Sequence, residues 1–237
     1  MSTVHCHKKS FTLIELLVVI AIGAMLTLLA IPAFRGMMRA NAVDDCAANL
    51  KNALERARVR AVSEHCYVAV ILPNGAVSET LKPYRLGGSR LAYVDKNVSG
   101  EYTFSRWLDP TWRSAPRGAL LSRVDTAAFV PQDGGITGCT VKITDALAGA
   151  SGVLAPVSGI KDENGAALDA GANCAFVFTP QGGVSGSGKC WLLISEGSAA
   201  NGDTIVYPTA NVAGSNSSAD NVVLKMNKLT GTVEYDK

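Results

Sequence analysis

The sequence predicts an α+β protein: a long N-terminal helix, membrane-spanning in its first half, packed on a C-terminal antiparallel β-sheet domain. Three observations support this fold class. Residues 11–33 are almost wholly apolar. Residues 34–65 continue with apolar or small side chains every three to four positions, which is typical of one buried helix face. Residues 66–237 contain short β-branched and aromatic runs separated by Gly, Pro and Asn, which is typical of strands and turns.

The apolar stretch at 11–33 is long enough to cross a bilayer, because a spanning helix needs about 20 residues. Glu15 is its one charged residue, and Lys8 and Lys9 stand directly before it. Basic flanks remain on the cytoplasmic side, so we expect residues 1–10 inside the cell and the rest of the chain outside. The stretch exceeds the apolar core of a cleaved secretory signal. It therefore predicts a retained membrane anchor.

Residues 34–65 read as the amphipathic half of the same helix. No proline occurs between Pro32 and Pro73, so one helix from Phe11 to about Ser63 is the simplest interpretation. At about 1.5 Å per residue it would be about 80 Å long. We expect a kink at Pro32, where a backbone hydrogen bond is lost.

The remainder, 66–237, is expected to form a β-rich globular head with an all-antiparallel pattern. Long segments rich in Gly, Pro, Ser or Asn are predicted as loops, at 108–138, 145–173 and 196–220. The predicted strands lie at 66–72, 91–95, 102–107, 139–144, 174–179, 190–195, 204–207, 221–226 and 232–235.

Charge is unevenly distributed along the chain, although the net charge is only +2. Aromatic side chains are interleaved with cations in the middle of the sequence, an arrangement that can grip single-stranded nucleic acid. A basic face that matches an acidic neighbouring subunit explains the same pattern, and we favour it. The residues concerned are Lys82, Arg85, Arg90, Lys96, Arg106, Arg113, Arg117 and Arg123, with Tyr84, Tyr93, Tyr102, Trp107 and Trp112.

The six cysteines include a candidate pair, Cys174 with Cys190, and Cys139 is the other candidate partner for Cys66. Cys174 and Cys190 flank a glycine-rich loop symmetrically, and opposed residues on two antiparallel strands have the short Cβ separation that a disulfide needs. Without Cys6, which precedes the apolar stretch, five cysteines remain. The odd number leaves at least one thiol free or paired between chains.

The sequence gives no support for catalysis, a metal site or a cofactor. The segment 183–190 nearly spells a phosphate-binding loop, but Cys190 replaces the required Ser or Thr and a strand pattern follows. His65 is the one histidine beyond residue 10, and there is no Cys-x-x-Cys pair. We therefore expect a protein that is not an enzyme.

The string Lys8-Lys9-Ser10-Phe11-Thr12-Leu13-Ile14-Glu15-Leu16 resembles the class III signal of type IV pilins and type II secretion pseudopilins. The resemblance implies a leader at 1–10, cut by a prepilin peptidase between Ser10 and Phe11, and methylation of the new N-terminal Phe11. It also implies that Glu15 is the assembly glutamate and that Pro32 is the kinking proline. Ser10 stands where the family usually has Gly.

A narrower resemblance joins the chain to the minor pseudopilin group that includes GspH and FimT. It rests on the segments LERARVRAVSEHCYVAV, FVFTPQGGVSGSG and VVLKMNKLTGTVEY. It implies a minor pilin or pseudopilin that is a structural subunit of a type IV pilus or a type II secretion pseudopilus. The alternative is a DNA-binding or tip adhesive pilin of an uptake system.

The implied partners are the prepilin peptidase, other pilin or pseudopilin subunits and the inner membrane. The implied location before assembly is a single pass through the inner membrane with the head in the periplasm. After assembly the subunit would lie in the filament or pseudopilus.

Overall fold

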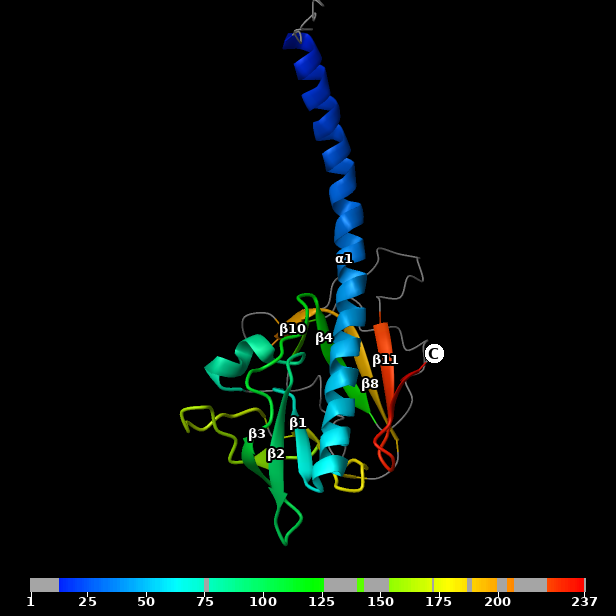
Figure 1. Cartoon of the computed structure of the whole chain (residues 1–237). Coiled ribbons are helices and arrows are strands. Elements are labelled where there is room, and N and C mark those ends of the chain that lie inside the picture. The colour runs from blue at the N-terminus through cyan, green and yellow to red at the C-terminus, as the bar shows by residue number, and fades with distance from the viewer. Residues whose placement is uncertain are drawn as a thin grey trace, which may run out of the picture. The chain divides into compact units, whose positions relative to one another are not determined.

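The computed structural model describes the backbone of residues 13–74, 77–125, 140–142, 154–171, 173–186, 189–199, 204–206 and 221–236 (Figure 1). The chain divides into two compact units, Met1–Met38 and Arg39–Lys237. We call the second unit the head. Its fold confirms the predicted α+β class, with a long helix followed by sheets.

The helix α1 extends from Leu13 to Glu64, so the predicted single helix is confirmed across the described residues. Its buried face in the head consists mainly of small side chains. Ala47, Ala57 and Ala61 have no exposed surface, and neither has Leu54. Small residues let the sheets approach the helix backbone closely. Pro32 lies within the helical range, and the predicted kink there stays a prediction.

A five-stranded sheet has the strand order β6-β3-β2-β1-β7. Strands β1, β2, β3 and β7 of this sheet match four of the predicted strands closely. The pairing of β3 with β6 is parallel, so the expectation of an all-antiparallel pattern is wrong at this edge. This pairing joins only Tyr102 with Val157 and Thr103 with Ser158. The strands are β1 (Tyr67–Ile71), β2 (Arg90–Lys96), β3 (Tyr102–Trp107), β6 (Val157–Ser158) and β7 (Ala175–Phe178).

The other strands form two separate sheets, of four strands in the order β12-β11-β8-β4 and of three in the order β5-β10-β9. Strands β4, β6 and β9 and the short helix η1 (Glu79–Tyr84) were not predicted. Prolines at 110 and 116 favoured a loop for the segment that contains β4. The strands are β4 (Ala119–Asp125), β5 (Thr140–Lys142), β8 (Lys189–Glu196), β9 (Ser198–Ala199), β10 (Thr204–Val206), β11 (Asn221–Asn227) and β12 (Val233–Asp236).

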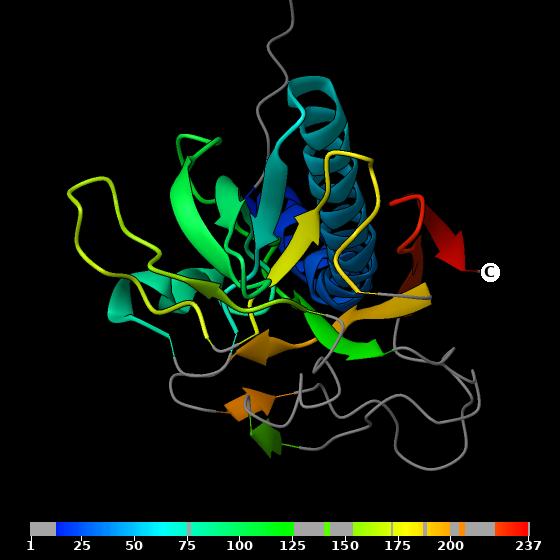
Figure 2. The same ribbon diagram turned by 90° about the horizontal axis from the view of Figure 1, so that it is seen from below.

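Two hydrophobic cores lie on opposite faces of the five-stranded sheet. Along β1, Val68 and Val70 join the core that contains α1 and the four-stranded sheet, whereas Ala69 and Ile71 join the second core. This alternation follows from the two-residue period of a strand. Figure 2 shows α1 alongside the strands from below. Both faces of the sheet are therefore covered.

The predicted pairing of Cys174 with Cys190 is corrected by this topology. Both thiols are free. Cys174 belongs to the second core and Cys190 to the α1 core, because β7 pairs with β1 while β8 pairs with β11 and β4. After Phe178 the chain makes a bridge at Val184 and passes to the other sheet, so the two strands do not form a hairpin.

We expect Cys66 to be the first of the four described cysteines to react with a maleimide in the native protein. Cys66 is half-buried and burial raises its pKa as well, but the other three thiols are fully buried, with the pKa of Cys46 and Cys190 raised to about 12 and that of Cys174 to about 11. Thiolates are the reactive form, so the buried thiols should react only after unfolding. Peptide mapping by mass spectrometry under non-reducing conditions measures this. A peptide that links Cys174 to Cys190 would contradict it.

Candidate functional site

The first described turns of α1 form a helix segment that is apolar all round and exposed within its own unit. We call residues 13–27 the assembly segment. Leu13 is 83% exposed and Met25 is 72% exposed. Soluble proteins rarely expose contiguous apolar surface of this kind unless a membrane or a partner covers it. Its exposed large side chains are Leu13, Ile14, Leu16, Leu17, Val18, Val19, Ile20, Ile22, Met25 and Leu26.

Glu15 is the one charged side chain of the assembly segment. It is exposed and lies in the first turn of the described helix, where a carboxylate interacts favourably with the helix dipole. Thr27 places its hydroxyl within the helix, since its Oγ1 donates to the Gly23 carbonyl at 2.7 Å. The Thr27 hydroxyl is therefore satisfied within the helix, and the Glu15 carboxylate is the distinctive chemical feature of the segment.

Ser10 and Phe11, the predicted cleavage and methylation sites, lie outside the described residues. The same holds for the leader at 1–10. Of the helices in the described ranges, none has the length and hydropathy required to cross a membrane.

Residues 6–31 match the family described as Prokaryotic N-terminal methylation motif. This range contains Ser10, Phe11 and Glu15 and ends just before Pro32. The N-terminal part of this chain therefore carries the sequence motif of that family. A search of curated proteins gave no match.

A crystal structure of the type IV minor pilin FimU of Pseudomonas aeruginosa is similar to this chain. The two share 14% identity over 83% of this chain and 90% of FimU, with a TM-score of 0.35.

The basic and aromatic residues of the middle sequence contact one another in the head. Trp112 lies between Tyr84 and Trp107, with ring centroids 5.7 Å and 5.3 Å away. Arg90 stacks on Trp107 at 4.1 Å, and Arg106 stacks on Tyr93 at 4.6 Å. All five aromatic side chains of the predicted set are buried or half-buried. These rings therefore stabilise the head and are not presented as an open stacking platform.

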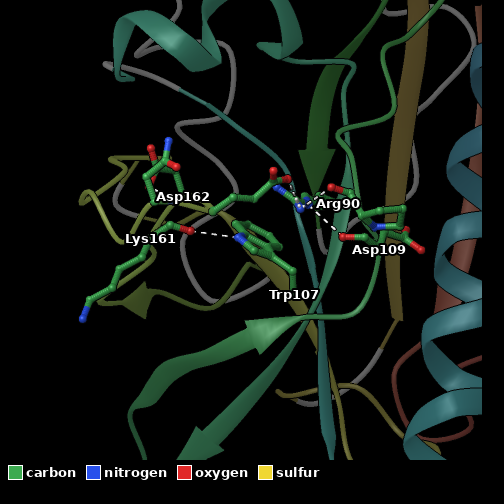
Figure 3. A network of polar contacts seen from close by, with 8 residues as sticks. Arg90, Trp107, Asp109, Lys161 and Asp162 are labelled. Atoms are coloured by element: carbon green, nitrogen blue, oxygen red, sulfur yellow. Dashed lines mark hydrogen bonds and ion pairs between the residues drawn. The ribbon is translucent and has the colours of Figure 1, made fainter.

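Arg90 is the centre of a buried polar network, shown in Figure 3. Only 4% of its side chain is exposed, and its guanidinium donates to the carbonyls of Asp109 and Pro110 and to the Glu163 carboxylate at 3.0 Å. Such a buried cation is acceptable because its donors are satisfied. The sequence indicated Arg90 only as part of a basic surface, and its burial at the start of β2 against two loops carried no local signal.

The loop that follows β6 is fixed to the same network. Trp107 donates its Nε1 proton to the Lys161 carbonyl at 2.8 Å, as Figure 3 shows. The Asp162 carboxylate accepts from the backbone N–H groups of Asn164 and Ala166 at 2.8 Å and 2.7 Å. In the described part of the chain, no group of three or more His, Cys, Asp or Glu side chains is placed to hold a metal ion.

Two carboxylates, those of Asp109 and Glu64, form polar contacts between α1 and the rest of the head. Asp109, 8% exposed, forms an ion pair with Arg56 of α1. Near the helix end, Glu64 accepts from the Tyr93 hydroxyl at 2.6 Å and pairs with Arg60 at 2.8 Å. These contacts, the Tyr93 hydrogen bond first, lower the pKa of Glu64. The second half of α1 is therefore held to the rest of the head by polar contacts as well as by its apolar face.

Proposed function

We propose that this chain is a minor pilin or pseudopilin, a structural subunit of a type IV pilus or a type II secretion pseudopilus. The observation that carries the proposal is the methylation motif at 6–31, which overlaps an exposed apolar helix with a single carboxylate. The exposed segment supports a role in packing against other helices, because it is too apolar to remain in water.

In this proposal a prepilin peptidase cuts the precursor between Ser10 and Phe11. The leader at 1–10 then remains on the cytoplasmic side. Phe11 becomes the N-terminal residue and is methylated on its amino group. Methylation leaves the amine protonatable, so the terminus keeps a positive charge that can pair with a carboxylate.

Before assembly, residues 11–33 anchor the chain in the inner membrane with the head in the periplasm. Transfer of the helix from lipid into a filament brings little hydrophobic gain, because lipid tails are as apolar as the neighbouring helices. Packing and polar pairing must therefore favour assembly. The carboxylate of Glu15 is the group that can provide such a pair.

The DNA-binding alternative has weaker support. Single-stranded nucleic acid needs accessible aromatic faces beside cations. Here Trp107 and Tyr93 are covered by Arg90 and Arg106, and Trp112 packs between two other rings. We therefore do not propose nucleic acid as a partner.

Processing tests the proposal directly. Co-expression with a prepilin peptidase should give a mature chain that starts at Phe11, measured by intact mass. Replacing Ser10→Gly should accelerate cleavage, since Gly is the usual residue before the cut in the family that the N-terminus resembles. A start at another residue, or no shortening with an active peptidase, would reject the assignment.

A further inference from the structure

A groove of about 640 Å³ lies in the head between α1 and the segment that follows β3. From α1 it is lined by Arg56, Val59 and Arg60. From the segment after β3 it is lined by Leu108, Asp109 and Arg113. The groove therefore combines three guanidinium groups with two apolar side chains.

The charges that line the groove do not balance. Arg60 is compensated by Glu64 at 2.8 Å, and Glu55, which also lines the groove, is compensated by Lys51 at 3.8 Å. Asp109 is then the one carboxylate that faces both Arg56 and Arg113. One positive charge is left over.

The uncompensated positive charge lies on Arg113, whose backbone is held by two hydrogen bonds to Ser89. Its N–H donates to the Ser89 carbonyl at 3.0 Å, and its own carbonyl accepts from the Ser89 N–H at 2.9 Å. The side chain is 51% exposed, and its Nε lies 4.0 Å from the Asp109 Oδ2, beyond hydrogen-bonding distance. Among the described residues no acceptor forms a hydrogen bond with this guanidinium. A carboxylate would match it with two parallel N–H donors.

The apolar side chains of the groove favour a protein as the occupant. Val59 is 63% exposed, and Leu108, which lines the same groove, is half-buried. Arginine next to apolar side chains is typical of protein interfaces. A free inorganic anion would neutralise Arg113 but would leave Val59 in water.

We infer that this groove binds a surface carboxylate, flanked by an apolar side chain, of a different pilin-like subunit next to it in the filament. The inference rests on the proposed function and deepens it by assigning a subunit contact to the head. Arg113 binds the carboxylate, and Val59 and Leu108 contact the apolar side chain. This charged contact adds a further constraint on subunit orientation to that of helix packing.

The test uses the full-length chain in cells that assemble filaments. A photoreactive amino acid replaces Asn52, an exposed residue that lines the groove. Irradiation should link the chain to a different pilin-like subunit, identified by mass spectrometry. Arg113→Glu should remove this crosslink and lower the ratio of filament to membrane protein about fivefold. Arg117→Glu is the matched control, since Arg117 is exposed and does not line the groove. It should leave both readouts unchanged.

Several outcomes would overturn the inference alone. They are equal effects of Arg113→Glu and Arg117→Glu, a crosslink from position 52 to a second copy of this chain, or no crosslink although the wild type enters filaments. The crosslink is measured in the wild-type background, so it decides the question even if Arg113→Glu impairs folding. Absence of the wild type from filaments would instead overturn the proposed function, and the inference with it.

Discussion

Replacing Glu15→Leu should leave membrane insertion and cleavage intact but abolish incorporation into filaments. The assembly segment is apolar on every side apart from this carboxylate. In a filament the apolar helices pack away from water, where an unpaired ion costs several kcal/mol, and pairing with a neighbour's N-terminal ammonium offsets that cost. Loss of the pair removes the polar attraction, while the helix becomes more apolar and inserts at least as well.

The measurement is the amount of this protein in sheared filaments relative to its amount in the membrane. We expect a fall of at least about tenfold, which corresponds to about 1.4 kcal/mol. Asp44→Leu is the matched control, because Asp44 is an exposed carboxylate on the same helix within the head. It should not change the ratio. Equal ratios for wild type and Glu15→Leu would mean that Glu15 has no role in assembly.

Replacing Leu54→Ala should destabilise the head by about 2–5 kcal/mol. Leu54 has no exposed surface and faces the core formed by α1 and the two larger sheets. Its truncation leaves a cavity, because the surrounding strands are fixed by their own pairing. The suitable protein is the fragment 39–237, since both cores consist of residues from Ala42 onward.

Val59→Ala is the control for this measurement. It lies five residues later on the same helix and is 63% exposed, so the change in unfolding free energy should stay within about 0.5 kcal/mol. Urea unfolding of the three fragments gives the comparison. If Leu54→Ala and Val59→Ala unfold at the same urea concentration, the packing of α1 on the sheets is not the main source of stability.

The helix and most strands could be predicted from the sequence because their signals are local. The apolar spacing from Val43 to Ala61 predicted the face of α1 that is buried, and the run at 102–107 predicted β3 to the residue. Pairing between distant strands has no such signal. Strand β4 pairs with β8 about 70 residues later, and the prolines before β4 concealed it.

In the candidate site, too, only the features with a local sequence signal could be predicted. Glu15 could be recognised because a carboxylate is unexpected in an apolar stretch, and the motif match at 6–31 includes it. The groove could not be predicted, since Arg56 and Asp109 are 53 residues apart and meet only through the fold. The pairing of Cys174 with Cys190 was wrong for a related reason. Symmetry about a turn predicts a hairpin only when both strands belong to one sheet, and here they do not.

The continuity of α1 has a mechanical consequence. The helix supplies nine buried residues to the head core, from Ala42 to Ala61, and the same backbone contains the assembly segment. Tension on a subunit held by its assembly segment would enter the head along the helix. Removing the helix from the head would require its buried contacts to slide past the sheets together, so the load is shared among them. The resistance of the helix to extraction from the head therefore grows with the length of its buried part.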